Sequence, residues 1–264
     1  TQLGTKLPLA GGTMTGTIAG FTSTGIDDNA TSTAITIDAS ENVTLTGTVN
    51  GLEINTTATS NLGLGTGAVD SITTGTHNVG LGDDAGTAIT TGHTNTAIGR
   101  DSLKTNTSGS YNTAVGTASL EANTTASYNT AVGKEALKLN TTGANNTANG
   151  YNALYSNTTG SNNTALGYNV LSSNTTGQYN IGIGGNDATN LTTLGNNTTG
   201  SSNVAVGMAA LLNNSTASNN TAVGYQSLRA NTTGANNTAS GYQSLYSNTT
   251  GSTNTSVGRV ASYS

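Results

Sequence analysis

Polar and apolar residues recur along most of this chain with a strict period of seventeen residues. Asparagine returns at that interval, and a glycine follows each of these asparagines four residues later. The one departure is the step from Asn180 to Asn203, which is 23 residues long. A short period with glycine at a fixed place predicts stacked structural repeats rather than a globule with a single cleft. The recurring asparagines are Asn61, Asn78, Asn95, Asn112, Asn129, Asn146, Asn163, Asn180, Asn203, Asn220, Asn237 and Asn254.

The first five positions of the repeat predict a short strand and a corner, if the recurring asparagine is numbered 1. Position 2 is Thr, Val, Ile or Leu, as suits a strand, and position 3 is always Ala, Gly or Ser, which lets another backbone approach closely. The glycine at position 5 is expected to adopt a conformation closed to other residues and to end the strand. Representative corner glycines are Gly99, Gly116, Gly133, Gly167 and Gly224.

Two apolar positions are the candidates for the core of the repeat. Position 4 is Leu, Ile or Val in ten of twelve copies, and position 9 is Leu in eight. We expect both side chains to point into the coil, opposite each other. An aspartate at position 4 should then place an unpaired charge in the core. The expected core residues include Val115, Leu120, Val132, Leu137, Leu166, Leu171, Val223 and Leu228.

Positions 12 to 15 commonly read Asn-Thr-Thr-Gly, which predicts a second corner with positive φ. One strand, one further anchor and two corners make one coil of a β-solenoid, whereas a helical repeat needs about 33 residues. The sequence therefore predicts an all-β parallel β-roll or β-solenoid of about twelve 17-residue coils, spaced by about 4.8 Å. The six extra residues of one copy, within residues 185–196, are expected to bulge outward as a loop.

Residues 1–60 lack the period and form a separate N-terminal segment, while residues 61–264 carry the repeats. Residues 33–38 and 43–49 alternate apolar and polar side chains, so each predicts a strand. A segment of short strands with so little core is marginal alone. We expect it to be ordered by intertwining with other chains.

Composition narrows the function classes. Charged residues make up 7% and aromatic residues 4% of the chain, and the net charge is only −5. Low hydrophobicity would suggest disorder, but disorder usually brings high net charge and no period. Most charges within the repeats lie at positions 6, 7 and 10, which predicts the solvent face. We expect the sequence to be a segment of a longer protein.

Catalytic, cofactor and metal sites are not expected. The seven basic residues form no nucleic-acid patch, and no apolar run reaches the roughly 18 residues of a membrane span. There is no cysteine, and His77 and His93 occupy different repeat positions, so they do not stack in register as ligands. Sequons such as Asn123-Thr124-Thr125 are interpreted as corner chemistry because their place in the repeat is regular. We therefore expect no enzymatic activity.

All ten tyrosines fall at positions 6, 10 and 17 of the repeat. One interpretation is that they cover neighbouring backbone or pack across chain interfaces with the hydroxyl in water. The other is that they stack on sugar rings of host glycans. The candidates for that second role are Tyr151, Tyr155, Tyr168, Tyr225, Tyr242 and Tyr246.

Two stretches resemble known families. The unit Asn-Thr-Ala-Val-Gly, as at Asn112 to Gly116, resembles the head repeats of trimeric autotransporter adhesins, although the repeats here are longer. That resemblance covers residues 61–264 and implies left-handed parallel β-rolls, three chains around one axis. The stretch Leu7-Pro8-Leu9-Ala10-Gly11-Gly12-Thr13-Met14-Thr15-Gly16 is similar to one common in bacteriophage tail fibres. Together they imply a homotrimeric viral fibre.

The expected function is that of a structural and adhesive shaft of a phage tail fibre, located in the virion and extracellular. It would present a receptor-binding tip, with other tail or fibre proteins and a host surface receptor or polysaccharide as partners. One alternative is the head of a bacterial trimeric surface adhesin. An ice-binding solenoid is less favoured, because the expected outward positions 6, 7 and 10 are irregular and charged.

Overall fold

The protein is described from a computed structural model that places residues 35–37, 43–45, 54–55, 60–185 and 191–262. Two compact units, Thr1–Thr48 and Val49–Ser264, are described separately. In the first unit, β1 (Ile35–Ile37) pairs antiparallel with β2 (Val43–Leu45). Both strands lie within the stretches that the alternating pattern predicts to be extended.

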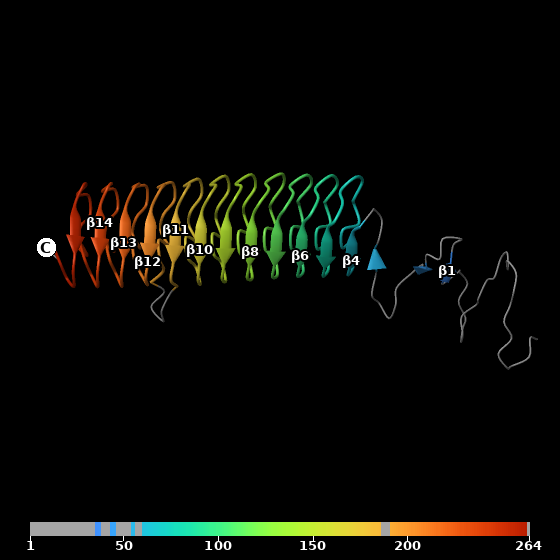
Figure 1. Cartoon of the computed structure of the whole chain (residues 1–264), viewed down its shortest axis with the longest axis horizontal. Helices are drawn as coiled ribbons and strands as arrows, with labels where there is room; N and C mark the ends of the chain where they lie inside the picture. The colour runs from blue at the N-terminus through green and yellow to red at the C-terminus, as the bar shows by residue number, and fades with distance from the viewer. Residues whose placement is uncertain (1–34, 38–42, 46–53, 56–59, 186–190, 263–264) are drawn as a thin grey trace, which may run out of the picture. The chain divides into compact units, whose positions relative to one another are not determined.

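The second unit is a parallel β-solenoid with one strand per repeat, and its coils are stacked side by side along the axis in Figure 1. A short β3 (Ile54–Asn55) pairs antiparallel with the first of these strands. The twelve parallel strands are β4 (Leu62–Leu64), β5 (Val79–Leu81), β6 (Thr96–Ile98), β7 (Thr113–Val115), β8 (Thr130–Val132), β9 (Thr147–Asn149), β10 (Thr164–Leu166), β11 (Ile181–Ile183), β12 (Val204–Val206), β13 (Thr221–Val223), β14 (Thr238–Ser240) and β15 (Thr255–Val257).

Each strand pairs with the same repeat positions of the next coil. Thr113 lies opposite Thr130, and Val115 lies opposite Val132. The predicted fold class is therefore confirmed: the described repeats form an all-β parallel solenoid with coils of about 17 residues, and the described residues include no helix.

Backbone hydrogen bonds between coils continue beyond the strands. Leu120 N donates to Ala136 O at 3.0 Å, Thr124 N to Thr141 O at 3.1 Å, and Tyr128 N to Ser110 O at 3.1 Å. Ladders thus run along the other sides of the coil as well as along the sheet. Each coil supplies hydrogen-bond partners to the backbone N–H and C=O groups of its neighbours. The irregular backbone around the narrow interior is therefore hydrogen-bonded as well.

The interior of the coil is filled by positions 3, 8 and 9. Ala114, Ser119 and Leu120 are fully buried, and their apolar equivalents from Ala85 onward form one core cluster. Val69, Ile72 and Ile89 form a second cluster in the first two coils. The expectation that the leucines at position 9 face inward is therefore confirmed. The fully buried leucines of this column are Leu103, Leu120, Leu137, Leu154, Leu171, Leu194, Leu211 and Leu228.

Position 4 does not face the interior, so the prediction that Val115, Val132, Leu166 and Val223 fill the core of the coil is wrong. The first three are half-exposed and Val223 is 40% exposed. Successive side chains of a strand point to opposite faces. Because the small residue at position 3 takes the inside, positions 2 and 4 point outward.

Two buried ladders of asparagine side chains run through the interior. At position 1, Asn112 N donates to Asn95 Oδ1 at 3.0 Å, and Asn112 Nδ2 crosses the coil to Ala126 O at 2.9 Å. At position 12, Asn123 Nδ2 donates to Asn106 Oδ1 at 2.8 Å and to the same Ala126 carbonyl at 3.0 Å. The position-12 ladder begins at Asn106, since the two preceding coils carry Ile72 and Ile89 there.

The second corner differs from its prediction. Positive φ occurs at positions 7, 9 and 17, in residues such as Ala118, Leu120 and Tyr128, whereas neither Asn123 nor the glycine at position 15 adopts it. The asparagine is instead a buried ladder residue. A Cβ at Gly143 would meet the carbonyl oxygen of Gly160 in the next coil, so close approach explains the glycine.

The first corner follows its prediction. Gly116 has φ of 132°, and a Cβ there would lie 2.6 Å from the carbonyl oxygen of Gly133. Both the conformation and the contact therefore favour glycine. The other position-5 glycines of the repeats also have positive φ.

The 23-residue step leaves the ladders intact. Ile181 pairs with Val204, and Asn203 N donates to Asn180 Oδ1 at 3.0 Å. Leu194 occupies the buried position 9 of this coil, which confines the extra residues to 185–192. The predicted outward loop falls largely on residues 186–190, which lie outside the described residues.

Candidate functional faces of the solenoid

The outer face of the sheet carries two columns, at positions 2 and 4. Position 2 is Thr in eight of the twelve strands, and position 4 is apolar in ten. Ile98, Ile181, Ile183 and Val223 are among the large apolar side chains that remain exposed on it. Monomeric proteins rarely leave a long contiguous apolar stripe in water. We call this surface the sheet face; its chemistry suits packing against another surface.

Charged groups gather on a second face, at positions 6, 7 and 10. Lys104 Nζ lies 2.8 Å from Asp101 Oδ1 and 3.0 Å from Asp84 Oδ2, so one ammonium links two coils. Its hydrogen bonds to Asp101 and Asp84 raise the pKa of Lys104 above the ordinary range. The predicted solvent face is therefore a network of surface ion pairs, and each such pair stabilises the fold only modestly.

Lys138 repeats this arrangement two coils further on. Its Nζ lies 3.3 Å from Glu135 Oε1 and 3.6 Å from Glu121 Oε2. Desolvation lowers the pKa of Lys138, but the hydrogen bond to Glu135 and the two carboxylate charges outweigh it, and the net shift is upward. The Lys104 and Lys138 ammonium groups thus each bridge neighbouring coils.

The six tyrosines predicted to contact glycans lie on this charged face, and several of their ring faces are already covered. Tyr151 stacks on Tyr168 with centroids 4.9 Å apart, and Lys134 lies over the Tyr151 ring at 5.4 Å. Tyr225 stacks on Tyr242, whose ring carries Arg259 at 5.5 Å. Tyr155 and Tyr246 are approached by Lys138 and Arg229 respectively. A role in glycan contact at these six residues stays a prediction.

The most exposed tyrosines are Tyr128 and Tyr179, at 59% and 60%, and both are at position 17. The repeat pattern alone does not distinguish them from the other tyrosines. Both follow the second corner of the repeat and precede the strand, and every residue at position 17 in residues 77–253 is exposed. Tyr111 stacks on Tyr128 with centroids 5.0 Å apart, and His93 meets Tyr111 edge-on.

Threonines line a third face, at positions 13 and 14. The position-13 hydroxyl commonly bridges coils, as where Thr141 Oγ1 donates to Thr158 O at 3.0 Å. Position 14 is Thr in every coil but one and is exposed throughout. The asparagines of the position-12 sequons from Asn106 to Asn231, such as Asn123, are fully buried and hydrogen-bonded, and Asn248 at the last such position is part-buried. Their regularity therefore has a structural cause.

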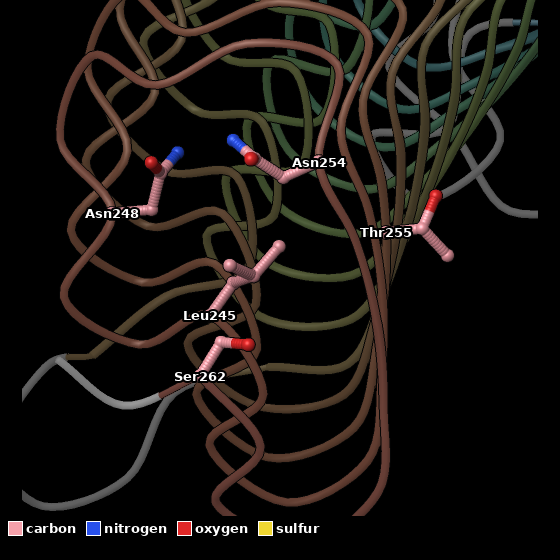
Figure 2. A pocket seen from close by; sticks show the side chains of 5 residues that line it. All are labelled: Leu245, Asn248, Asn254, Thr255 and Ser262. Atoms are coloured by element: carbon pink, nitrogen blue, oxygen red, sulfur yellow. The ribbon is translucent and has the colours of Figure 1, made fainter.

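A hollow of about 270 Å³ lies at the last described coil. In Figure 2, Asn248 and Asn254 point toward each other across the coil, with Leu245 beneath them. These are positions 12, 1 and 9, which the next coil covers elsewhere in the solenoid. The hollow is thus the cross-section of the coil interior rather than a cleft in the wall of the solenoid.

The described residues offer little for metal chemistry. No group of three or more His, Cys, Asp or Glu side chains in the described part of the chain could hold an ion. His77 Nδ1 lies 3.0 Å from Thr76 Oγ1, and His93 contacts Ser110 and Tyr111. Across the described ranges, no helix has the length and apolar character needed to cross a bilayer.

Comparison with known proteins returned no match to any family model, curated protein or solved structure. The geometry of the coils and the chemistry of their three faces are therefore what points to a function.

Proposed function

We propose that residues 61–264 form the structural and adhesive shaft of a bacteriophage tail fibre, an extracellular part of the virion. The observation that carries this proposal is the one-to-one ladder from β4 to β15, which persists across the longer step after Asn180. Because backbone and asparagine ladders both link every coil to the next, the unit resists bending. Eleven steps of about 4.8 Å give a rigid length of about 53 Å.

The sheet face supports self-association into the proposed homotrimer. Its apolar column is left in water by a single chain, and packing three such faces around one axis would remove it from solvent. Val115 and Val132 would then belong to the core of the assembly and not to the core of the coil. This arrangement also fits the resemblance to trimeric adhesin heads.

Adhesion along the shaft is the second part of the proposal. Three chains with many coils turn a weak contact with a host receptor or polysaccharide into useful avidity without a deep pocket. The shaft would hold a receptor-binding tip away from the particle and connect it to other tail or fibre proteins. Catalysis has no place in this proposal.

The head of a bacterial surface adhesin remains the alternative, since the repeat unit itself resembles that family. Immunogold labelling of purified virions and of the bacterial surface separates the two locations. An ice-binding role is also less favoured, because the strands do not present paired outward threonines. Each described strand of the solenoid presents at most one outward threonine, at position 2, because position 4 is never Thr.

Length is the property that tests the shaft role. Deleting residues 112–145 removes two whole coils and keeps the register, so the shaft should shorten by about 10 Å. We expect adsorption of virions that carry this chain to fall. Replacing the same residues with a second copy of residues 203–236 should restore adsorption, because these 34 residues form two coils and restore the length of the shaft. Unchanged adsorption by the deletion variant would contradict a role in reach.

A further inference from the structure

We infer that Tyr128, Asn145, Asn162 and Tyr179 form a binding site for a neutral glycan on the side of the solenoid. The inference rests on the proposed adhesive function and supplies its ligand class and residues. The four side chains occupy position 17 of four consecutive coils, so they form one column in the order Tyr, Asn, Asn, Tyr.

The backbone holds the four residues in equivalent conformations. Their φ values are 62°, 59°, 60° and 56° in chain order. Each N–H donates to the position-16 carbonyl of the preceding coil, at 3.1, 3.2, 3.0 and 3.1 Å. Equal φ and an unbroken ladder place the four Cβ atoms at regular intervals along the axis. The site is therefore built on the rigid scaffold of the coils.

Two tyrosines form the walls of the site. Tyr111 and Tyr128 stack with their planes only 3° apart, so aromatic rings in this column stack at one ring per coil. In the next coil the column continues with the shorter Asn145, so among the described residues no further aromatic ring stacks on Tyr128, which is 59% exposed. Tyr179 lies three coils further on, about 14 Å away at 4.8 Å per coil. A sugar ring stacked on each tyrosine at about 4 Å leaves about 6 Å between the two rings.

Two amides form the floor. Asn145 and Asn162 are exposed, and neither side chain has a hydrogen-bond partner among the described residues. Each amide offers two donors and one acceptor oxygen, which suits hydroxyl and acetamido groups of a sugar. Position 16 beside them carries Ser127, Ala144 and Ser161, whereas the charges of these coils lie at positions 6, 7 and 10. The surroundings thus favour a neutral glycan.

The tyrosines on the charged face lack this combination. Lys134 covers a face of Tyr151, and Arg259 covers a face of Tyr242, so a cation closes one end of each stack. Position 17 instead presents open ring faces with unpaired amides between them. Aromatic walls with a few polar groups between them are the usual make-up of a small-ligand site.

Saturation-transfer NMR on the full chain tests the site, with chitohexaose and cellohexaose at about 5 mM as probes. We expect transfer from tyrosine ring protons to at least one probe. Tyr128→Leu and Tyr179→Leu should each weaken binding about tenfold, while Tyr128→Phe and Tyr179→Phe keep the ring and keep binding. Asn236→Leu is the matched control, because Asn236 is exposed at the same repeat position with φ of 59° but lies outside the site, and it should leave binding unchanged. No transfer to either probe, or transfer that survives both leucine variants, would overturn the site.

The separation of the walls gives a second test. Inserting an extra copy of residues 146–162 after Asn162 retains all four side chains but moves the tyrosines one coil further apart. We expect affinity for the hexasaccharides to fall, and unchanged affinity would overturn the two-wall site. Chain mass and virion adsorption are read separately. If the chain assembles and supports adsorption but binds no sugar, the glycan site is contradicted and the shaft proposal is not. If the chain binds sugar but is absent from virions, the shaft proposal is contradicted and the glycan site is not.

Discussion

At the scale of single residues, the buried asparagines are the least replaceable polar groups of the coil. Asn123→Ala would remove the side-chain donor to Asn106 Oδ1 and one of the two side-chain donors to the Ala126 carbonyl. It would also leave Asn140 Nδ2 with only one of its two partner oxygens, the Gly143 carbonyl. We expect the free energy of unfolding to fall by about 2–4 kcal/mol, since unpaired buried groups are costly. Urea denaturation provides the measurement. The exposed Thr125→Ala in the same corner should be nearly neutral, and an equal loss in both variants would contradict the ladder's role.

Gly116 and Ala118 both have positive φ, but substitution should destabilise the fold at Gly116 and have little effect at Ala118. Gly116→Ala places a Cβ against Gly133 at a φ of 132°, so we expect clear destabilisation. Ala118 has φ of 57°, so Ala118→Gly relieves the conformational strain of a left-handed alanine, which is about 1 kcal/mol. The glycine also raises the conformational entropy of the unfolded chain, and this destabilises the fold by a similar amount. That variant should be close to neutral. Thermal melting of both variants decides the matter, and a larger loss for Ala118→Gly would contradict the described corner.

At the scale of the strand, the two faces of β7 and its coil should differ sharply. Leu120→Ala opens a cavity in the narrow core and should cost about 2–5 kcal/mol. Val115→Ala removes a half-exposed side chain and should cost the isolated chain under about 1 kcal/mol. Denaturation at a concentration where the chain is monomeric compares the two. Equal losses in the free energy of unfolding would contradict the outward orientation of position 4.

The period, the strand and the inward leucine could be predicted from the repeat, but the orientation of the strand could not be obtained from apolar residues alone. Val115 and Leu120 are both apolar, so hydrophobicity does not tell which of them faces inward. Only the alternation of side chains between the two faces of the strand distinguishes them. Thr113 carries the distinguishing signal, because it shares a face with Val115 and a threonine hydroxyl is not expected to be buried in every coil. The buried role of Asn123 was hidden because asparagine is equally common in exposed turns.

The candidate glycan site could not be predicted for a related reason. Tyr128 and Tyr179 are conspicuous only when position 17 is known to point outward, and repeat position alone did not say so. The cations over Tyr151 and Tyr242 come from adjacent coils, so they follow from stacking geometry and not from local sequence.

At the scale of the whole molecule, the seventeen-residue register should matter more than total length. Deleting residues 129–145 removes one coil and keeps every ladder residue opposite its equivalent. We expect this variant to stay folded with a slightly shorter solenoid. Deleting residues 129–144 shifts the register by one residue and turns strand side chains to the wrong faces. Circular dichroism and small-angle scattering compare the variants, and equal stability of the two deletions would contradict the stacked-coil account.

The mass of the full chain in solution tests the central claim, assembly through the sheet face, most directly. Light scattering after size exclusion should give about 78 kDa, three times the 26.1 kDa of one chain. In the double variant Val115→Asp and Val132→Asp, adjacent carboxylates on every chain would be buried in the interface, and we expect folded monomers of 26.1 kDa. A monomeric parent chain, or a double variant that keeps the trimer mass, would contradict the account.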